Sequence, residues 1–292
     1  MSLPQTLLLG FIAGATILLG LPIGRVRKPA ASLRVLLNAT AIGILLFLFW
    51  DVLAAAWEPV DGALAKLDGV HGLGQALGYG SLFVLGISAG LLSLVAYERW
   101  MRNRAKTTAA PALNFGPGAM SVEELPARQG FAAWSAGRQL ALLIAVGIGL
   151  HNFAEGLAIG QSAASGAVQL AVLLVIGFAL HNATEGFGIC APLASEAGEG
   201  AQVTRPGWGF LLMLGAVAGG PTFIGTIVGY NFTSEPVSVL IMTLAAGSIL
   251  YVVMQLMGVA MKSGRRELVA VGVLAGLLAG FLTDAIITAA GV

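Results

Sequence analysis

Eight long apolar segments, separated by short polar stretches, constrain this chain more than any other feature of its sequence. An α-helix needs about 20 predominantly apolar residues to cross the hydrocarbon core of a membrane. The segments of this kind are residues 5–24, 32–56, 73–97, 138–161, 168–193, 208–230, 236–261 and 267–290. The composition agrees, because 57% of the residues are hydrophobic and 10% are charged, whereas soluble domains carry about a quarter charged residues. The sequence predicts an all-α membrane protein with eight transmembrane helices and one transmembrane domain over residues 1–292.

The basic residues predict how these helices are oriented. Of the 15 lysines and arginines, all but Lys66 fall on the same side when the eight segments are threaded through a membrane. Cytoplasmic loops carry the excess of basic residues, so both termini are expected on the non-cytoplasmic side and residues 101–137 form a long cytoplasmic loop. The first segment lacks the flanks of a cleaved signal peptide and is expected to be retained. The net charge of +1 gives no indication of a nucleic-acid partner.

The first three segments resemble the last three. The aligned glycines are Gly14 with Gly219, Gly43 with Gly247, and Gly90 with Gly276. Because the two sets of three cross the membrane in opposite directions, we predict an inverted repeat, in a 3+2+3 arrangement around the fourth and fifth segments. Inverted repeats are typical of alternating-access carriers, in which the binding site lies near the midplane where the repeats meet.

The fourth and fifth segments each contain the pattern H-N-x-x-E-G. The two copies comprise His151, Asn152 and Glu155 in HNFAEG, and His181, Asn182 and Glu185 in HNATEG. On a helix, residues i and i+4 lie on one face, so each histidine is expected next to its glutamate. The asparagine lies on the flank of that face.

The two copies are predicted to meet near the middle of the membrane. The connection near residues 160–166 is short, and counting about 1.5 Å per residue places both histidines roughly 15–20 Å from the outer surface of the core. Ionisable residues at such depth are costly and mark a pathway. Two carboxylates facing each other repel unless a cation or proton lies between them. Two imidazoles and two carboxylates suit a divalent ion such as Zn²⁺, Fe²⁺, Mn²⁺, Co²⁺ or Cd²⁺. The alternative is that the two His–Glu pairs are only hydrogen bonds that hold the helices together. That role would not require two matching pairs at the same depth.

In these features the sequence resembles the Zrt/Irt-like (ZIP) family of divalent metal transporters, bacterial type. The resemblance extends over the whole chain in topology and is most specific in HNFAEG and HNATEG. It implies that the fourth and fifth helices are packed inside the others. It also implies that a divalent metal, zinc before the others, is carried into the cytoplasm across the bacterial inner (plasma) membrane by sliding of one helix group against another. Asn152 and Asn182 then join the histidines and glutamates as metal-binding residues, and no prosthetic group is expected.

Three features depart from the pattern of that family. Gly220 precedes Pro221 where the family often has Glu-Pro, Gln255 stands where many members have a glutamate, and residues 101–137 contain no histidine. Glu155 and Glu185 carry enough negative charge to neutralise one divalent ion but not two. The sequence therefore predicts one metal ion per chain and no histidine-based cytoplasmic sensor.

Three further polar residues are candidates for the pathway to the site. Asp51 and Asp284 each lie about seventeen residues past the cytoplasmic end of their segments, in the outer part of the membrane. They could attract cations, or they could be interfacial acids that reach solvent. The repeat aligns Asp51 with Gln255 and Glu98 with Asp284, so Gln255 is the third candidate.

Two other classes of protein place histidine and glutamate in membrane helices. An intramembrane metallohydrolase is disfavoured because the H-E-x-x-H order is absent, and the chain is not expected to be an enzyme. A proton-coupled carrier of a non-metal substrate stays open, since Glu and His also relay protons. A homodimer is also left open. The partners expected from the sequence are a divalent metal ion and the lipid bilayer.

Overall fold

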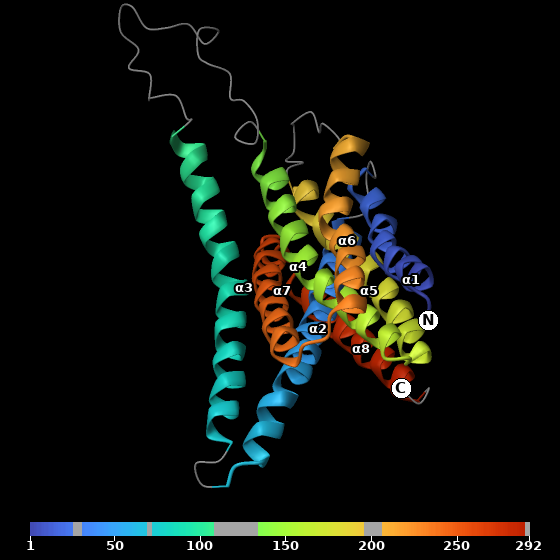
Figure 1. The fold of residues 1–292 in the computed structure, drawn as a ribbon. Helices are drawn as coiled ribbons and strands as arrows, with labels where there is room; N and C mark the ends of the chain where they lie inside the picture. Colours follow the sequence, from blue (N-terminus) through green and yellow to red (C-terminus); the bar gives the residue numbers. More distant parts are fainter. Residues whose placement is uncertain (26–30, 69–71, 108–133, 196–205, 290–292) are drawn as a thin grey trace, which may run out of the picture.

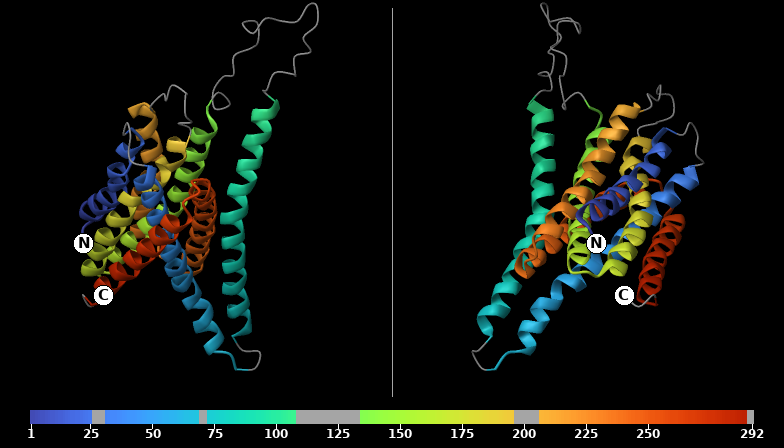
Figure 2. Two further views of the ribbon diagram at one scale, coloured as in Figure 1. Left: turned by 180° about the vertical axis from the view of Figure 1, so that it is seen from behind. Right: turned by 45° about the vertical axis from the view of Figure 1, so that its right-hand side comes forward.

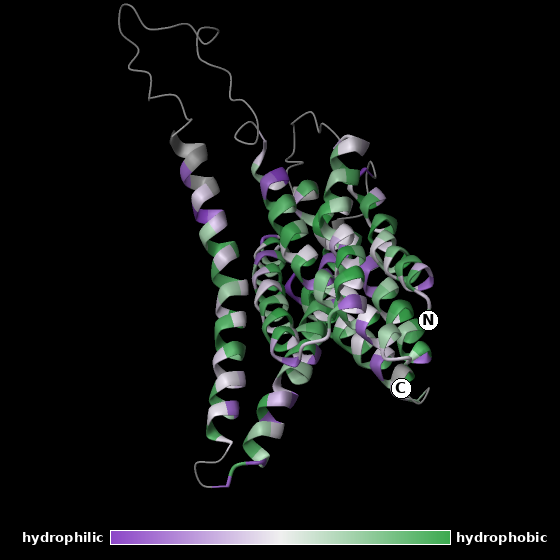
Figure 3. Ribbon diagram, in the orientation of Figure 1, coloured by the Kyte–Doolittle hydropathy of each residue, from purple (hydrophilic) through white to green (hydrophobic). Residues whose placement is uncertain are grey.

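The computed structural model describes residues 1–25, 31–68, 72–107, 134–195 and 206–289, and all regular elements in them are helices (Figure 1). These elements are α1 Leu3–Ala15, η1 Thr16–Leu19, η2 Leu21–Arg25, α2 Ala31–Ala65, α3 Leu73–Thr107, α4 Ala136–Ala164, α5 Val168–Ser195, α6 Trp208–Asn231, α7 Glu235–Met261 and α8 Arg266–Ala289. Within the described residues, eight helical segments are long and apolar enough to cross a membrane, with α1, η1 and η2 counted as one. The prediction of an all-α chain with eight helices long and apolar enough to span a membrane is confirmed. Hydrophobic residues dominate the helices, as Figure 3 shows.

The first span is less regular than predicted. Its α-helix ends at Ala15, and the chain continues in two 3₁₀ segments to Arg25. Pro22 has no backbone N–H to continue a helix, and the backbone at Gly20 lies against the backbone of Gly186 in α5. Hydropathy alone predicts one straight helix here because it does not register either effect.

The second and third spans are longer than predicted. Helix α2 continues to Ala65 and α3 to Thr107, which takes α3 into the segment predicted as loop. At the outer end, Val60 and Ala63 of α2 pack with Ala76 and Tyr79 of α3. This contact explains why α2 stays helical past Pro59 and beyond the apolar segment. Residues 108–133 of the predicted loop lie outside the described residues.

Helix α4 occupies the middle of the bundle. In its most apolar stretch 72% of the residues are buried, against 39% in α5 and 17% in α3. It contacts α5, α6 and α7, while α3 lies at the edge next to α7 (Figures 1 and 2). Of the two helices expected at the centre, α4 is the most buried of the eight, whereas α5 is less buried than α2, α6 and α7 and exposes Ile176 and Leu180.

Paired glycines bring neighbouring helices into close contact. The backbones of α1 and α6 touch where Gly14 meets Gly219. A methyl group added to Gly43 of α2 would lie 2.9 Å from Cα of Gly276 in α8. One added to Gly247 of α7 would lie 3.1 Å from Cα of Gly90 in α3. Only glycine allows such approach, and small residues at helix contacts are typical of membrane proteins. Gly14 and Gly219 are aligned with each other, and the alignment converts the Gly43–Gly276 contact into the Gly247–Gly90 contact.

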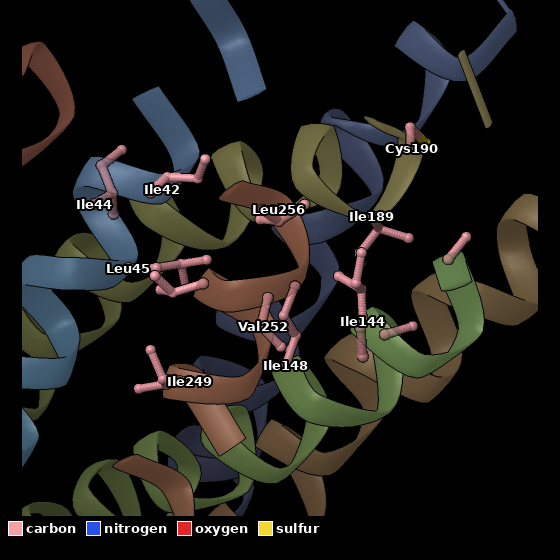
Figure 4. Packing of buried hydrophobic residues seen from close by; sticks show 14 of the residues in the cluster. Ile42, Ile44, Leu45, Ile144, Ile148, Ile189, Cys190, Ile249, Val252 and Leu256 are labelled. Carbon is pink, nitrogen blue, oxygen red and sulfur yellow. The ribbon is translucent and has the colours of Figure 1, made fainter. Parts of the chain in front are cut away.

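A hydrophobic cluster fills the half of the bundle that is predicted to face the cytoplasm. It joins Leu45 of α2, Ile144 and Ile148 of α4, Ile189 of α5 and Val252 of α7 (Figure 4). Ile144, Ile148 and Ile189 lie within two helical turns of the H-N-x-x-E-G motifs. The motifs are therefore bordered on this side by close-packed aliphatic side chains.

Candidate metal site

The α4 copy of the motif forms the centre of a buried polar cluster. His151 and Glu155 lie one turn apart in an uninterrupted helix, so both side chains point to the same face. His151 Nε2 is 2.8 Å from Glu155 Oε1. The sequence prediction that each histidine shares a face with the following glutamate is confirmed for this copy.

The α5 copy adds a second imidazole to the same carboxylate oxygen. His181 Nε2 contacts Oε1 of Glu155, the oxygen that also faces His151. The two imidazole ring centroids are 6.2 Å apart. Glu185 completes the group, with its Oε1 3.9 Å from His151 Nε2. The structure therefore brings all four predicted His and Glu residues together, with Glu155 between the two imidazoles.

These side chains are almost completely removed from solvent. The exposed fraction is 1% for His151, 3% for Glu155 and 1% for Glu185, while His181 keeps 11%. Among the described residues, the ion-pair partners of the two carboxylates are the histidines alone. Burying two carboxylates without a lysine or arginine costs several kcal/mol per charge. A bound cation would remove this cost.

Several buried oxygen atoms of the cluster have no hydrogen-bond partner in the part of the chain that the structure describes. They are Glu155 Oε2, both carboxylate oxygens of Glu185, and Oδ1 of Asn152 and Asn182. Buried polar atoms are nearly always paired in proteins. The unpaired acceptors around two imidazoles form a group that could hold a cation.

The two asparagines of the motifs bond to other helices. Asn152 Nδ2 donates to the backbone oxygen of Ala218 in α6 at 2.9 Å. Asn182 Nδ2 donates to the backbone oxygen of Ala13 in α1 at 3.1 Å. Both asparagines are fully buried. Their amide groups therefore join α4 to α6 and α5 to α1 beside the cluster.

The three pathway candidates lie in two different places. Asp51 is close enough to Asp284, His181 and His151 for charge–charge interaction. Gln255 instead donates through Nε2 to Oε2 of Glu98 in α3 at 3.2 Å. Asp51 therefore lies near the His/Glu cluster with Asp284 close to it, and Gln255 joins α7 to α3.

Sequence reasoning missed one contact of the His/Glu cluster and one contact beside Gln255. The ring of Phe178 lies 5.4 Å from that of His181, centroid to centroid. Tyr251 donates to Oε2 of Glu98 at 3.1 Å, next to Gln255. Phe178 stands one turn before His181, so helical spacing could have found it. Nothing in the local sequence relates Glu98 to α7, although the alignment of the two ends pairs Glu98 with Asp284.

The donor atoms of His151, Glu155 and His181 all lie within 4.8 Å of one another. Ligands of a zinc ion at about 2.0–2.2 Å from the metal are separated by distances of this order. Imidazole and carboxylate are also the donor types that such an ion takes.

No family model matches this chain, and a search of curated proteins finds no match either. The chain is an integral membrane protein with a buried His/Glu group that could bind metal.

Proposed function

We propose that this protein carries a divalent transition metal, zinc before the others, through the membrane at the His/Glu cluster. The observation that supports this most strongly is the position of Glu155, whose Oε1 faces Nε2 of both His151 and His181 in a site from which water is nearly excluded. Glu185 supplies the second negative charge. Together the four side chains offer two neutral and two anionic donors, which balance one 2+ ion.

The contacts between helices support an inverted repeat, which is the usual architecture of alternating-access carriers. Helix α2 packs on α8, and α3 packs on α7. The alignment relates these two helix pairs, and their glycine contacts match. The asparagine bonds match as well, because Ala13 and Ala218 correspond when Gly14 is aligned with Gly219.

The surroundings of the cluster support a direction of entry. Asp51 and Asp284 lie on the side predicted to face outward, and His181 is the ligand that keeps some exposure to solvent. The opposite side is filled by the aliphatic cluster around Ile144 and Ile148. In this arrangement an ion enters past the aspartates, and release to the cytoplasm requires helices to move apart.

Uptake into proteoliposomes tests the proposed function. Vesicles that contain the full chain and an enclosed zinc-sensitive dye should report flux when Zn²⁺ is added outside. Glu155→Gln should abolish that flux. Glu267→Gln should not, because it makes the same chemical change at an exposed residue outside the cluster. Flux through Glu155→Gln equal to that of the unchanged protein would refute the proposal.

The contact of His181 with Glu155 also suits a proton relay, which supports the alternative of a proton-coupled carrier for a non-metal substrate. The same vesicles separate the two functions. A carrier of a non-metal substrate predicts no response of the zinc-sensitive dye when Zn²⁺ is added outside, whereas a metal carrier predicts one. We further propose that the chain belongs to the ZIP family and acts in the bacterial plasma membrane with both termini outside.

A further inference from the structure

The amide groups of Asn152 and Asn182 are committed to neighbouring helices. Each side chain is 0% exposed and donates through Nδ2 to a backbone oxygen: that of Ala218 for Asn152 and that of Ala13 for Asn182. Because the amide is planar, fixing Nδ2 also fixes the direction of Oδ1. An asparagine held in this way cannot turn to follow an ion.

The accepting oxygens lie where regular helical bonding is disturbed. Ala13 is two residues before the end of α1, where the chain changes to the 3₁₀ segment η1. Ala218 follows Val217, whose backbone oxygen loses its helical partner because Pro221, four residues further on in α6, has no N–H. Backbone oxygens at such places are better placed to accept a side-chain donor than those inside a regular helix.

The backbone next to each asparagine is also in close contact with the same partner helix. A methyl group on Gly156 would lie 2.9 Å from the backbone nitrogen of Thr226 in α6. One on Gly186 would lie 2.8 Å from Cα of Gly20, which follows α1 and η1. Each motif helix is thus joined to its partner at two points, one on either side of the metal-binding glutamate.

We infer that Asn152 and Asn182 are positioning residues, which hold α4 against α6 and α5 against α1 so that the histidines and glutamates face one another. This inference rests on the metal site proposed above and differs from the expectation that the asparagines bind the ion. The asparagines act through the helices that carry the ligands. The metal is held by His151, Glu155 and His181 with Glu185.

The chain contains a matched control for this role. Asn38 of α2 is 5% exposed, and its Nδ2 donates to the backbone oxygen of Leu256 in α7 at 3.2 Å. It is thus a buried asparagine with the same kind of interhelical bond. It precedes Asp51 by thirteen residues, about 20 Å along the helix, so its loss should not disturb the site.

The test compares Asn152→Ala, Asn182→Ala and Asn38→Ala in purified full-length protein. Zn²⁺ affinity is measured by competition with a chelating dye, and the ligands of the bound zinc are counted by X-ray absorption. Asn152→Ala and Asn182→Ala should each weaken binding by about tenfold, the usual net effect of one hydrogen bond. The number of zinc ions and of nitrogen and oxygen ligands per ion should not change. Asn38→Ala should bind zinc like the unchanged protein.

Loss of one ligand in Asn152→Ala or Asn182→Ala would overturn the inference, because it would make that asparagine a metal ligand. Unchanged affinity in both variants, or an equal loss in Asn38→Ala, would overturn it as well. If an alanine variant does not fold, Asn152→Asp keeps the shape but lacks the N–H donor. Positioning predicts weaker binding for this variant, while a ligand role predicts tighter binding from the added charge. Failure of the unchanged protein to bind zinc would instead refute the proposed function.

Discussion

The two copies of H-N-x-x-E-G have the same sequence pattern and unequal surroundings. In the α4 copy, Glu155 faces both imidazoles through one oxygen. In the α5 copy, Glu185 lies 3.9 Å from the imidazole nitrogen of His151, and neither of its oxygens has a hydrogen-bond partner among the described residues. Helix α4 is also the more enclosed of the two. Residues that are equivalent in a repeat can therefore differ in what they contribute, and the α4 copy forms the centre of the site while the α5 copy completes it.

The largest effect is expected for Glu155→Gln. The variant replaces the one carboxylate that contacts both histidines with a neutral amide. Loss of residues that only orient a metal ligand weakens binding by about 10–100-fold, so loss of this central ligand should weaken it by more than about 100-fold. Zinc competition in detergent measures the change, with Glu267→Gln as control. Binding within tenfold of the unchanged protein would contradict the central position of Glu155.

A smaller loss is expected for Glu185→Gln. This variant removes one of the two negative charges but leaves the contacts of Glu155 with His151 and His181 intact. We expect zinc affinity to fall by about 100-fold, the upper end of the effect of losing a residue that only orients a ligand, and by less than in Glu155→Gln. Measuring the zinc affinity of Glu155→Gln and Glu185→Gln in one assay tests this difference. A loss as large as that in Glu155→Gln would mean that the two copies contribute equally.

Acidification should weaken binding through the histidines. Imidazole binds metal only in its neutral form, and an ordinary imidazole is about nine-tenths protonated at pH 5.5. Lowering the pH from 7.5 to 5.5 should therefore reduce zinc affinity. His181→Ala binds more weakly at pH 7.5 and should show a shallower dependence on pH. An affinity that is the same at both pH values would exclude His151 and His181 as ligands.

The sequence predicts which residues form the site but not the difference between the two copies of the motif. Helical spacing places His151 with Glu155 and His181 with Glu185, because positions i and i+4 share a face whatever surrounds them. How α4 and α5 rotate against each other depends on packing with α1, α6 and α7. That rotation brings His181 to Glu155, which lies 26 residues earlier in the chain.

The same limit applies to the fold. Apolar length predicts eight spans, and the glycine alignment relates the pairs that meet, such as Gly43 with Gly276 and Gly247 with Gly90. Hydropathy does not predict the extension of α2 to Ala65, because side-chain contacts with α3 at Ala76 and Tyr79 stabilise it outside the apolar segment. It also misses the partner of Gln255, which depends on how α3 packs on α7.

The smallest effect is expected for Asp51→Asn. Asp51 interacts by charge with both copies of the motif but belongs to neither. Its loss should slow zinc uptake by a few-fold at low zinc concentration and leave the maximal rate nearly unchanged, because a nearby charge raises the local cation concentration without binding the ion at the site. Asp61→Asn is the matched control on the same helix, at an exposed residue. A large loss of maximal rate in Asp51→Asn would place Asp51 among the ligands.

The location and number of the bound ions test the account most directly. Anomalous diffraction from crystals of the zinc-loaded protein should show one ion per chain, at about 2.0–2.2 Å from Nε2 of His151 and of His181 and from a carboxylate oxygen of Glu155 and of Glu185. Two negative charges neutralise one 2+ ion, and a second ion about 4 Å away would be strongly repelled in a site of low dielectric constant. Two adjacent, fully occupied ions, or a single ion held away from these four side chains, would contradict the proposed single-ion site.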